Sequence, residues 1–153
     1  MTYTEYKDKA QQEFNALPIF WAYSDKQFAE AMSERGLTIN DTDKIYRLGQ
    51  GGFYLKTDAP VIRAYLNREN PLPKLMQDHD FAVSAFKCEM DNHEYAINYQ
   101  GDWDVCSCFT KGTPVYGEDK TYVEYLTEAG MADLIPAYRE AKRAHFKDAE
   151  SWY

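Results

Sequence analysis

KLMQDHDFAVSAFKCEMDNHEYA, residues 74–96, carries the strongest helical pattern in this chain of 153 residues. Apolar side chains recur there at spacings of three and four, which places them on one face of an α-helix. Asp80 falls inside this stripe, so the stretch predicts either one long helix or two abutting helices. The side chains that form the stripe are Leu75, Met76, Phe81, Ala82, Ala85, Phe86, Met90 and His93.

Two further helices are expected in the first 40 residues. Residues 4–16 repeat apolar side chains at helical spacing. Ser24 and Gln27 have the Ser-x-x-Gln pattern of a capping box, which predicts a helix from residue 25 to about residue 35. Gly36 follows at the position where a left-handed helix end favours glycine.

Strand signals lie between and after these two helices. Residues 44–48 and 53–56 flank the loop Gly-Gln-Gly-Gly at 49–52, a pattern that predicts a β-hairpin. Residues 19–23 read Ile-Phe-Trp-Ala-Tyr, and such a run predicts a segment buried on both sides. Periodicity alone leaves it open whether this segment is a strand or a buried connector.

The rest of the chain adds helices. Pro60, just after Asp58, suits the first turn of a helix, and two helices at about 119–129 and 131–148 are separated by Gly130. The sequence therefore predicts an α+β, mostly helical fold. We expect a single globular domain over residues 1–153, with a small β-hairpin packed against helices.

Composition excludes several classes of protein. A hydrophobic content of 44% and an aromatic content of 16% argue against a disordered chain. No run approaches the roughly 20 apolar residues needed to span a bilayer, and the N-terminus shows no apolar signal segment. The odd number of cysteines, Cys88, Cys106 and Cys108, excludes a complete disulfide framework. We expect a reduced, cytoplasmic protein.

The net charge of −8 is concentrated in one stretch. Residues 78–133 hold three basic and twelve acidic side chains, a net charge of −9, whereas residues 1–77 are balanced. A concentrated negative field repels nucleic acid and anionic lipid and attracts basic surfaces. The basic residues of the last helix, Arg139, Lys142, Arg143 and Lys147, are interpreted as a solvated face.

A metal site is one candidate within the acidic stretch. Glu89 and His93 are four residues apart, so one helical face presents both to one ion, with Glu94 next to them. A third ligand would come from His79 or Asp80. The alternative is a glutamate–histidine pair that stabilises the helix.

Other catalytic motifs are weak. The loop at 49–52 lacks the flanking residues of a phosphate-binding loop and is interpreted as a hairpin turn. The thiols of Cys106 and Cys108 lie in sequence beside Asp102 and Asp104, whose negative charge raises a thiol pKa and disfavours a nucleophile.

A protein-binding surface is the other candidate. Aromatic anchors supply binding energy and charges steer the encounter, so interleaved carboxylates and aromatic rings suit docking to a basic groove. Glu118, Asp119 and Tyr116 extend this pattern. The residues predicted to bind a partner are Glu89, Asp91, Glu94, Tyr95, Tyr99, Asp102, Trp103 and Asp104.

Several motifs together resemble a family of small uncharacterised proteins from phages and mobile elements of gut bacteria. The resemblance covers residues 14–105 and implies an accessory protein of a mobile element, but it assigns no residue a role. The motifs are Phe14-Asn15-x-Leu17-Pro18, Phe20-x-Ala22-Tyr23-Ser24-x-x-Gln27-Phe28, Asp41-Thr42-Asp43-Lys44-Ile45-Tyr46, Gly51-Gly52-Phe53 and Asn92-His93-Glu94-Tyr95.

Three functional hypotheses follow. The first is a non-enzymatic acidic protein that binds a basic, nucleic-acid-handling host protein such as a defence nuclease, as an anti-CRISPR or anti-restriction inhibitor would. It requires no catalytic residue, metal or cofactor, and no direct contact with nucleic acid or membrane. The second is a metal-dependent hydrolase or nuclease that uses Glu89, His93 and Glu94. The third is a structural or regulatory protein that associates with itself.

Overall fold

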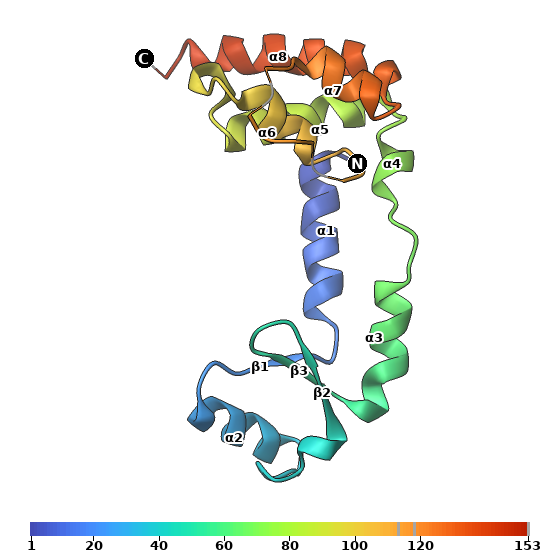
Figure 1. The fold of residues 1–153 in the computed structure, drawn as a ribbon, viewed down its shortest axis with the longest axis vertical. Helices are drawn as coiled ribbons and strands as arrows, with labels where there is room; N and C mark the ends of the chain where they lie inside the picture. Colours follow the sequence, from blue (N-terminus) through green and yellow to red (C-terminus); the bar gives the residue numbers. More distant parts are fainter. Residues whose placement is uncertain (113, 118, 153) are drawn as a thin grey trace. The chain divides into compact units, whose positions relative to one another are not determined.

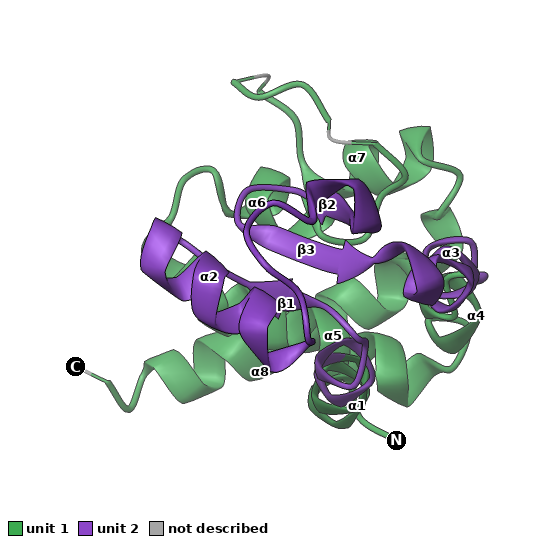
Figure 2. Ribbon diagram, turned by 90° about the horizontal axis from the view of Figure 1, so that it is seen from below, with its two compact units in different colours: residues 1–10, 70–153 green, residues 11–69 purple. Residues whose placement is uncertain are grey.

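The computed structural model describes residues 1–112, 114–117 and 119–152. The chain divides into two compact units, residues 1–10 with 70–153 and residues 11–69, which we call unit one and unit two (Figure 2). Division into compact units does not test whether the chain folds as one domain, so the single-domain expectation stays a prediction.

Within the described residues the fold is α+β and mostly helical, as the sequence predicts (Figure 1). Short 3₁₀ helices lie at Thr42–Lys44, Lys56–Asp58, Tyr95–Ile97 and Ala132–Leu134. The strands are β1 (Phe20–Trp21), β2 (Ile45–Leu48) and β3 (Gly52–Leu55). The α-helices are α1 (Tyr3–Asn15), α2 (Asp25–Glu34), α3 (Ala59–Leu66), α4 (Leu72–Leu75), α5 (His79–Asn92), α6 (Gly101–Ser107), α7 (Tyr122–Glu128) and α8 (Ile135–Ala149).

The stretch 74–96 forms the centre of unit one as two helices rather than one. The break falls just before α5, because the Asp78 carboxylate caps that helix by accepting a hydrogen bond from the Phe81 N–H at 2.8 Å. Asp80, the residue expected to mark a break, lies in the first turn of α5 instead. Helix α8 packs along α5 (Figure 1). Between these helices, the rings of Phe86 and Tyr138 meet edge to face with centroids 5.0 Å apart.

The apolar faces of the helices form the core of unit one. Phe86, Met90, Val105 and Leu126 are fully buried there, together with Tyr138 of α8. The two closing helices are shorter than expected, since residues 119–121 precede α7 and a 3₁₀ turn precedes α8. No helix among the described residues is long and apolar enough to cross a membrane.

Unit two contains the predicted hairpin, and the segment 19–23, for which strand and buried connector were both open, supplies a third strand. Strands β2 and β3 pair antiparallel, and β1 pairs with the other edge of β3 to give the order β1-β3-β2. The expectation that residues 19–23 are buried on both sides was wrong. Phe20 is buried, but Trp21 is 44% exposed, because a two-residue strand at the sheet edge points alternate side chains to opposite faces.

The predicted capping box opens α2. The Ser24 hydroxyl accepts a hydrogen bond from the Gln27 N–H at 3.2 Å, and the Gln27 side chain accepts one from the Tyr23 N–H at 2.8 Å. Gly36 has the left-handed conformation expected after the helix, with φ of 72°. These contacts fix where the chain leaves β1 and enters α2, which forms one wall of a pocket described below.

A substitution at Gly52 tests how closely the three-stranded sheet packs around this position. A Cβ atom at this position would lie 2.3 Å from the Leu48 carbonyl oxygen and 3.0 Å from the Trp21 ring. We therefore expect Gly52→Ala to lower the free energy of unfolding by about 1–3 kcal/mol, measured by urea denaturation. Gln50→Ala, an exposed position in the same turn, is the control. Equal stability of Gly52→Ala and the parent chain would contradict this packing.

Candidate metal centre

Three side chains of metal-ligand type converge in unit one. Glu89 lies on α5, His93 directly follows α5 one turn later, and Cys108 directly follows α6. Glu89 Oε2 lies 3.5 Å from His93 Nε2 and 3.5 Å from Cys108 Sγ, and the Cys108 Sγ to His93 Nε2 distance is 3.8 Å. One oxygen, one nitrogen and one sulfur atom therefore form a compact triangle.

The dimensions of this triangle suit a tetrahedral ion. Zinc binds nitrogen and oxygen at about 2.0–2.1 Å and sulfur at about 2.3 Å, so tetrahedral ligand atoms lie roughly 3.3–3.6 Å apart. The three observed separations match that spacing within a few tenths of an ångström. The three side chains can occupy one face of a tetrahedron and leave the fourth position open.

Glu89 is buried, and its second oxygen is held by the N-terminal helix. Only 6% of the residue is exposed. Glu89 Oε1 accepts a hydrogen bond from the Tyr3 hydroxyl at 3.0 Å and an ion-paired one from Lys7 at 3.4 Å. These contacts orient the carboxylate so that Oε2 points toward His93 and Cys108, as ligand-orienting partners do in metal sites.

The ionisation of the two acidic ligands follows from this environment. Burial alone would raise the pKa of Glu89, but the hydrogen bond from Tyr3 and the charge of Lys7 bring the pKa below its ordinary value. Burial and the neighbouring Glu89 charge raise the pKa of the Cys108 thiol to about 12. Without an ion, the protonated thiol is a donor to Glu89; with an ion, the metal displaces that proton.

The structure brings together only part of the metal site that the sequence suggests. The Glu89–His93 pair lies as expected. His79 pairs with Glu140 at 2.5 Å, and neither it nor Asp80 joins the Glu89 group. Glu94 is exposed in a left-handed conformation with φ of 51° and also lies outside the group. The expected contribution of these three residues is therefore wrong.

Cys108 is the ligand that sequence reasoning missed. Its raised pKa disfavours the alternative role of a nucleophile. The residue type alone could have indicated Cys108 as a ligand, because Cys is a ligand that zinc prefers. The 14 residues between His93 and Cys108, however, include two helical segments whose packing the sequence does not show.

Several residues predicted to bind a partner make contacts that hold unit one together. Asp102 Oδ1 accepts hydrogen bonds from the hydroxyls of Tyr95 and of Tyr138, the latter at 2.8 Å, and Oδ2 accepts one from the Tyr122 N–H at 3.0 Å. Burial and the Asp102 hydrogen bond raise the pKa of Tyr95. Tyr122 stacks on Tyr138 with a ring separation of 4.4 Å.

Asp91 and Asp104 also have internal partners. Asp91 accepts from the fully buried His145 at 2.7 Å and pairs with Lys87 at 2.9 Å. Asp104 accepts from Asn98 at 2.7 Å. These carboxylates are consequently committed to local contacts.

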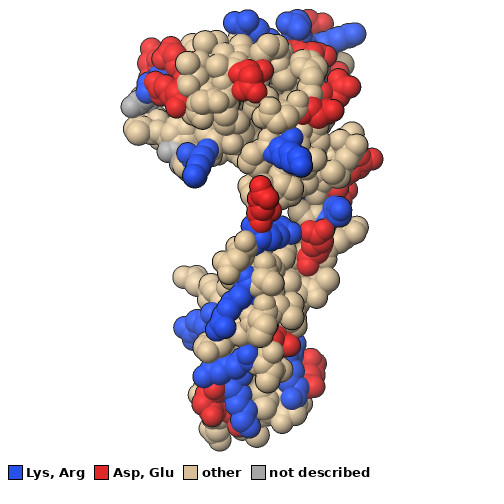
Figure 3. Space-filling model, turned by 90° about the vertical axis from the view of Figure 1, so that its right-hand side faces the viewer, with Lys and Arg blue, Asp and Glu red and all other residues tan. Residues whose placement is uncertain are grey.

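Few of the predicted binding residues face solvent freely. The Trp103 indole donates to the Pro114 carbonyl oxygen at 2.8 Å and packs against Tyr116. Tyr99 is 93% exposed and Glu94 is exposed, whereas Glu118 lies outside the described residues. On the face drawn in Figure 3, acidic and basic side chains are interspersed rather than segregated. The partner-binding role of these residues stays a prediction.

Comparison with known proteins places the chain in a family but gives no activity. A family model described as "Family of unknown function (DUF7659)" matches residues 2–107. This match supports the resemblance to an uncharacterised family, and it includes Glu89 and His93 but ends one residue before Cys108. No curated protein and no solved structure matches the chain.

The lowered pKa of Glu89 predicts a pH-dependent contribution to stability. Because the folded-state pKa lies below the ordinary value, the stabilisation is complete above that value and is lost as the pH falls through the folded-state pKa. We expect Glu89→Gln to lower the free energy of unfolding by about 1–3 kcal/mol at neutral pH. The difference in free energy of unfolding between the two proteins should narrow as the pH falls below the ordinary glutamate pKa of about 4.5. Urea denaturation across this pH range measures it, and a pH-independent difference would contradict the assignment.

Proposed function

This chain belongs to the family of unknown function DUF7659, and from that starting point we propose that it is a zinc-dependent hydrolase. The observation that carries the proposal is the triangle formed by Glu89 Oε2, His93 Nε2 and Cys108 Sγ, with sides of 3.5, 3.5 and 3.8 Å. Three protein ligands with an open fourth position are typical of catalytic rather than structural zinc.

The charges of the site favour a divalent ion. Glu89 and a Cys108 thiolate together balance the two positive charges of zinc, and the ion favours the thiolate form. Cys108 is exposed and His93 is half-buried, so water can reach the open position. Zinc lowers the pKa of a bound water to about 7 and so supplies a nucleophile at neutral pH.

Lys7 favours anionic substrates. Its ammonium group lies 3.4 Å from Glu89 Oε1 and is partly exposed, which places a positive charge beside the proposed ion. A phosphodiester or a carboxylate approaching the open position would experience both charges. We therefore infer that the substrate carries negative charge at or near the bond that is cleaved.

Zinc binding is expected to depend on each ligand. The parent protein should bind one zinc ion per chain in isothermal titration calorimetry, and Cys108→Ser and His93→Ala should each weaken binding by at least about tenfold, since each removes one ligand. Cys88→Ser and His79→Ala are matched controls, because neither residue belongs to the triangle, and both should bind zinc like the parent. Equal binding by Cys108→Ser and the parent would overturn the site.

Hydrolysis of bis(p-nitrophenyl) phosphate by the zinc-loaded protein is the second readout of this experiment. Activity should disappear in His93→Ala, and Lys7→Ala should raise KM for this anionic substrate. A protein that binds zinc through the three ligands but shows no activity above the His93→Ala background would contradict the hydrolytic function, while leaving the metal site intact.

A second candidate function is the binding of a basic partner, which the exposed segment after α5 favours. Glu94, Ile97 and Tyr99 lie there, and Ile97 and Tyr99 are 67% and 93% exposed. An exposed carboxylate beside large apolar side chains suits an interface with a basic surface. We infer that such a partner would be a nucleic-acid-handling host protein, met by an inhibitor from a phage or mobile element.

Substitution of this segment tests the second candidate. Purified CRISPR effector nucleases and restriction endonucleases are the probes, and biolayer interferometry at low and high salt is the measurement. Glu94→Lys and Tyr99→Ala should each weaken any complex by about tenfold or more, and high salt should also weaken it. Glu30→Lys, an exposed position on α2, should bind like the parent. Binding that is unaffected by both substitutions would contradict this interface.

A further inference from the structure

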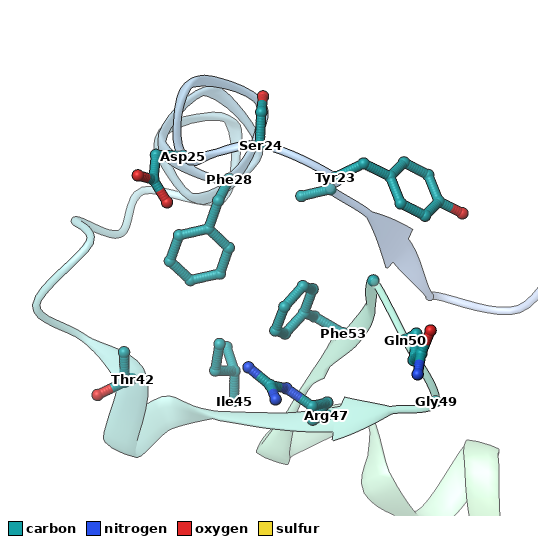
Figure 4. A pocket seen from close by; sticks show the side chains of 12 residues that line it. Tyr23, Ser24, Asp25, Phe28, Thr42, Ile45, Arg47, Gly49, Gln50 and Phe53 are labelled. Carbon is teal, nitrogen blue, oxygen red and sulfur yellow. The ribbon is translucent and has the colours of Figure 1, made fainter.

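Unit two contains an open pocket that the proposed metal site does not involve. Its volume is about 790 Å³, which lies within the range of small-molecule sites. The walls come from the start of α2, from β2, and from the glycine-rich turn between β2 and β3 (Figure 4). The lining residues are Ala22, Tyr23, Ser24, Asp25, Phe28, Thr42, Ile45, Arg47, Gly49, Gln50, Gly51 and Phe53.

The floor of the pocket is aromatic. Phe28 and Phe53 lie with ring centroids 5.1 Å apart at 55°, and Phe20 stacks on Phe53 at 5.6 Å. Phe28, Phe53 and the neighbouring Ile45 are only half-buried, so part of their apolar surface faces the open space (Figure 4). Such a surface favours a flat ring, because aromatic pairs gain stability beyond simple area burial.

Arg47 places a positive charge in this pocket. Figure 4 shows its guanidinium directed between Ile45 and Phe53. Its centre lies 5.7 Å from the Phe53 ring, and within the described part of the chain no carboxylate is close enough to form an ion pair with it. In the same unit, Arg68 is held by Glu13 at 2.9 Å. The guanidinium group of Arg47 can therefore donate two parallel hydrogen bonds to a phosphate or a carboxylate.

The glycine-rich turn forms part of the pocket wall. Gly51 has φ of 87°, and a Cβ atom there would lie 2.6 Å from the Tyr23 ring, so only glycine allows the turn to pass this close to Tyr23. The turn is the hairpin connection that the sequence predicts, yet its backbone also lines the pocket. Asp25, on the wall formed by α2, adds an acceptor for amino or hydroxyl groups.

We propose that this pocket binds a nucleoside monophosphate, with the base on the Phe28 and Phe53 rings and the phosphate on Arg47. The charge of unit two permits such an anion, since residues 11–69 carry seven basic and eight acidic side chains, whereas the rest of the chain carries ten and seventeen. A free nucleotide and the 5′-terminal nucleotide of an oligonucleotide present the same chemistry to the site.

Isothermal titration of the full chain with AMP, adenosine and inorganic phosphate tests the proposal. AMP should bind about ten- to a hundredfold more tightly than adenosine or phosphate alone, because only AMP contacts both the rings and Arg47. Arg47→Met should bind AMP and adenosine equally, and Arg47→Lys should retain part of the preference for AMP. Arg63→Met, an exposed position on α3 outside the pocket, is the matched control.

A 5′-phosphorylated oligonucleotide separates the two ligand sources. Binding tighter than that of AMP would assign the site to a nucleic-acid end, and binding weaker than that of AMP would assign it to a free nucleotide. Circular dichroism verifies that Arg47→Met is folded, which is expected because Arg47 is exposed. The proposal is overturned if neither AMP nor the oligonucleotide binds, or if Arg47→Met binds AMP as tightly as the parent does.

Discussion

The buried carboxylate of Glu89 is the constraint around which unit one is arranged. A carboxylate on a buried residue is costly unless it is paired and hydrogen-bonded, and Glu89 is only 6% exposed. One oxygen is satisfied by Tyr3 and Lys7 from α1, and the other faces His93 and Cys108. The contacts that compensate this buried charge thus bring the first turns of α1 and the end of α6 to the same face of α5.

Local patterns in the sequence predict most of the helices, because their causes lie within a few residues. The Ser24 capping box and the left-handed Gly36 are examples, and the hairpin follows from the turn at 49–52. Two features are not settled by such local patterns. The short strand β1 forms only by pairing with β3. The break before α5 depends on which of two neighbouring aspartates, Asp78 or Asp80, caps the helix.

The candidate site divides in the same way. Glu89 and His93 were predictable as a pair, since four-residue spacing on a helix places both on one face. The approach of Cys108 arises from packing between helices, and the sequence does not show it. The same limit applies to the acidic stretch, where a local net charge of −9 suggested a binding surface. Asp102 accepts three hydrogen bonds within unit one. The sequence does not show this, because a net charge says nothing about the direction in which a side chain points.

X-ray absorption spectroscopy at the zinc edge would show whether Glu89, His93 and Cys108 bind one zinc ion together. We expect a first shell with one sulfur at about 2.3 Å and three nitrogen or oxygen atoms at about 2.0–2.1 Å, the third being water. A shell without sulfur would contradict binding by these three residues, and so would a six-coordinate shell of oxygen atoms alone.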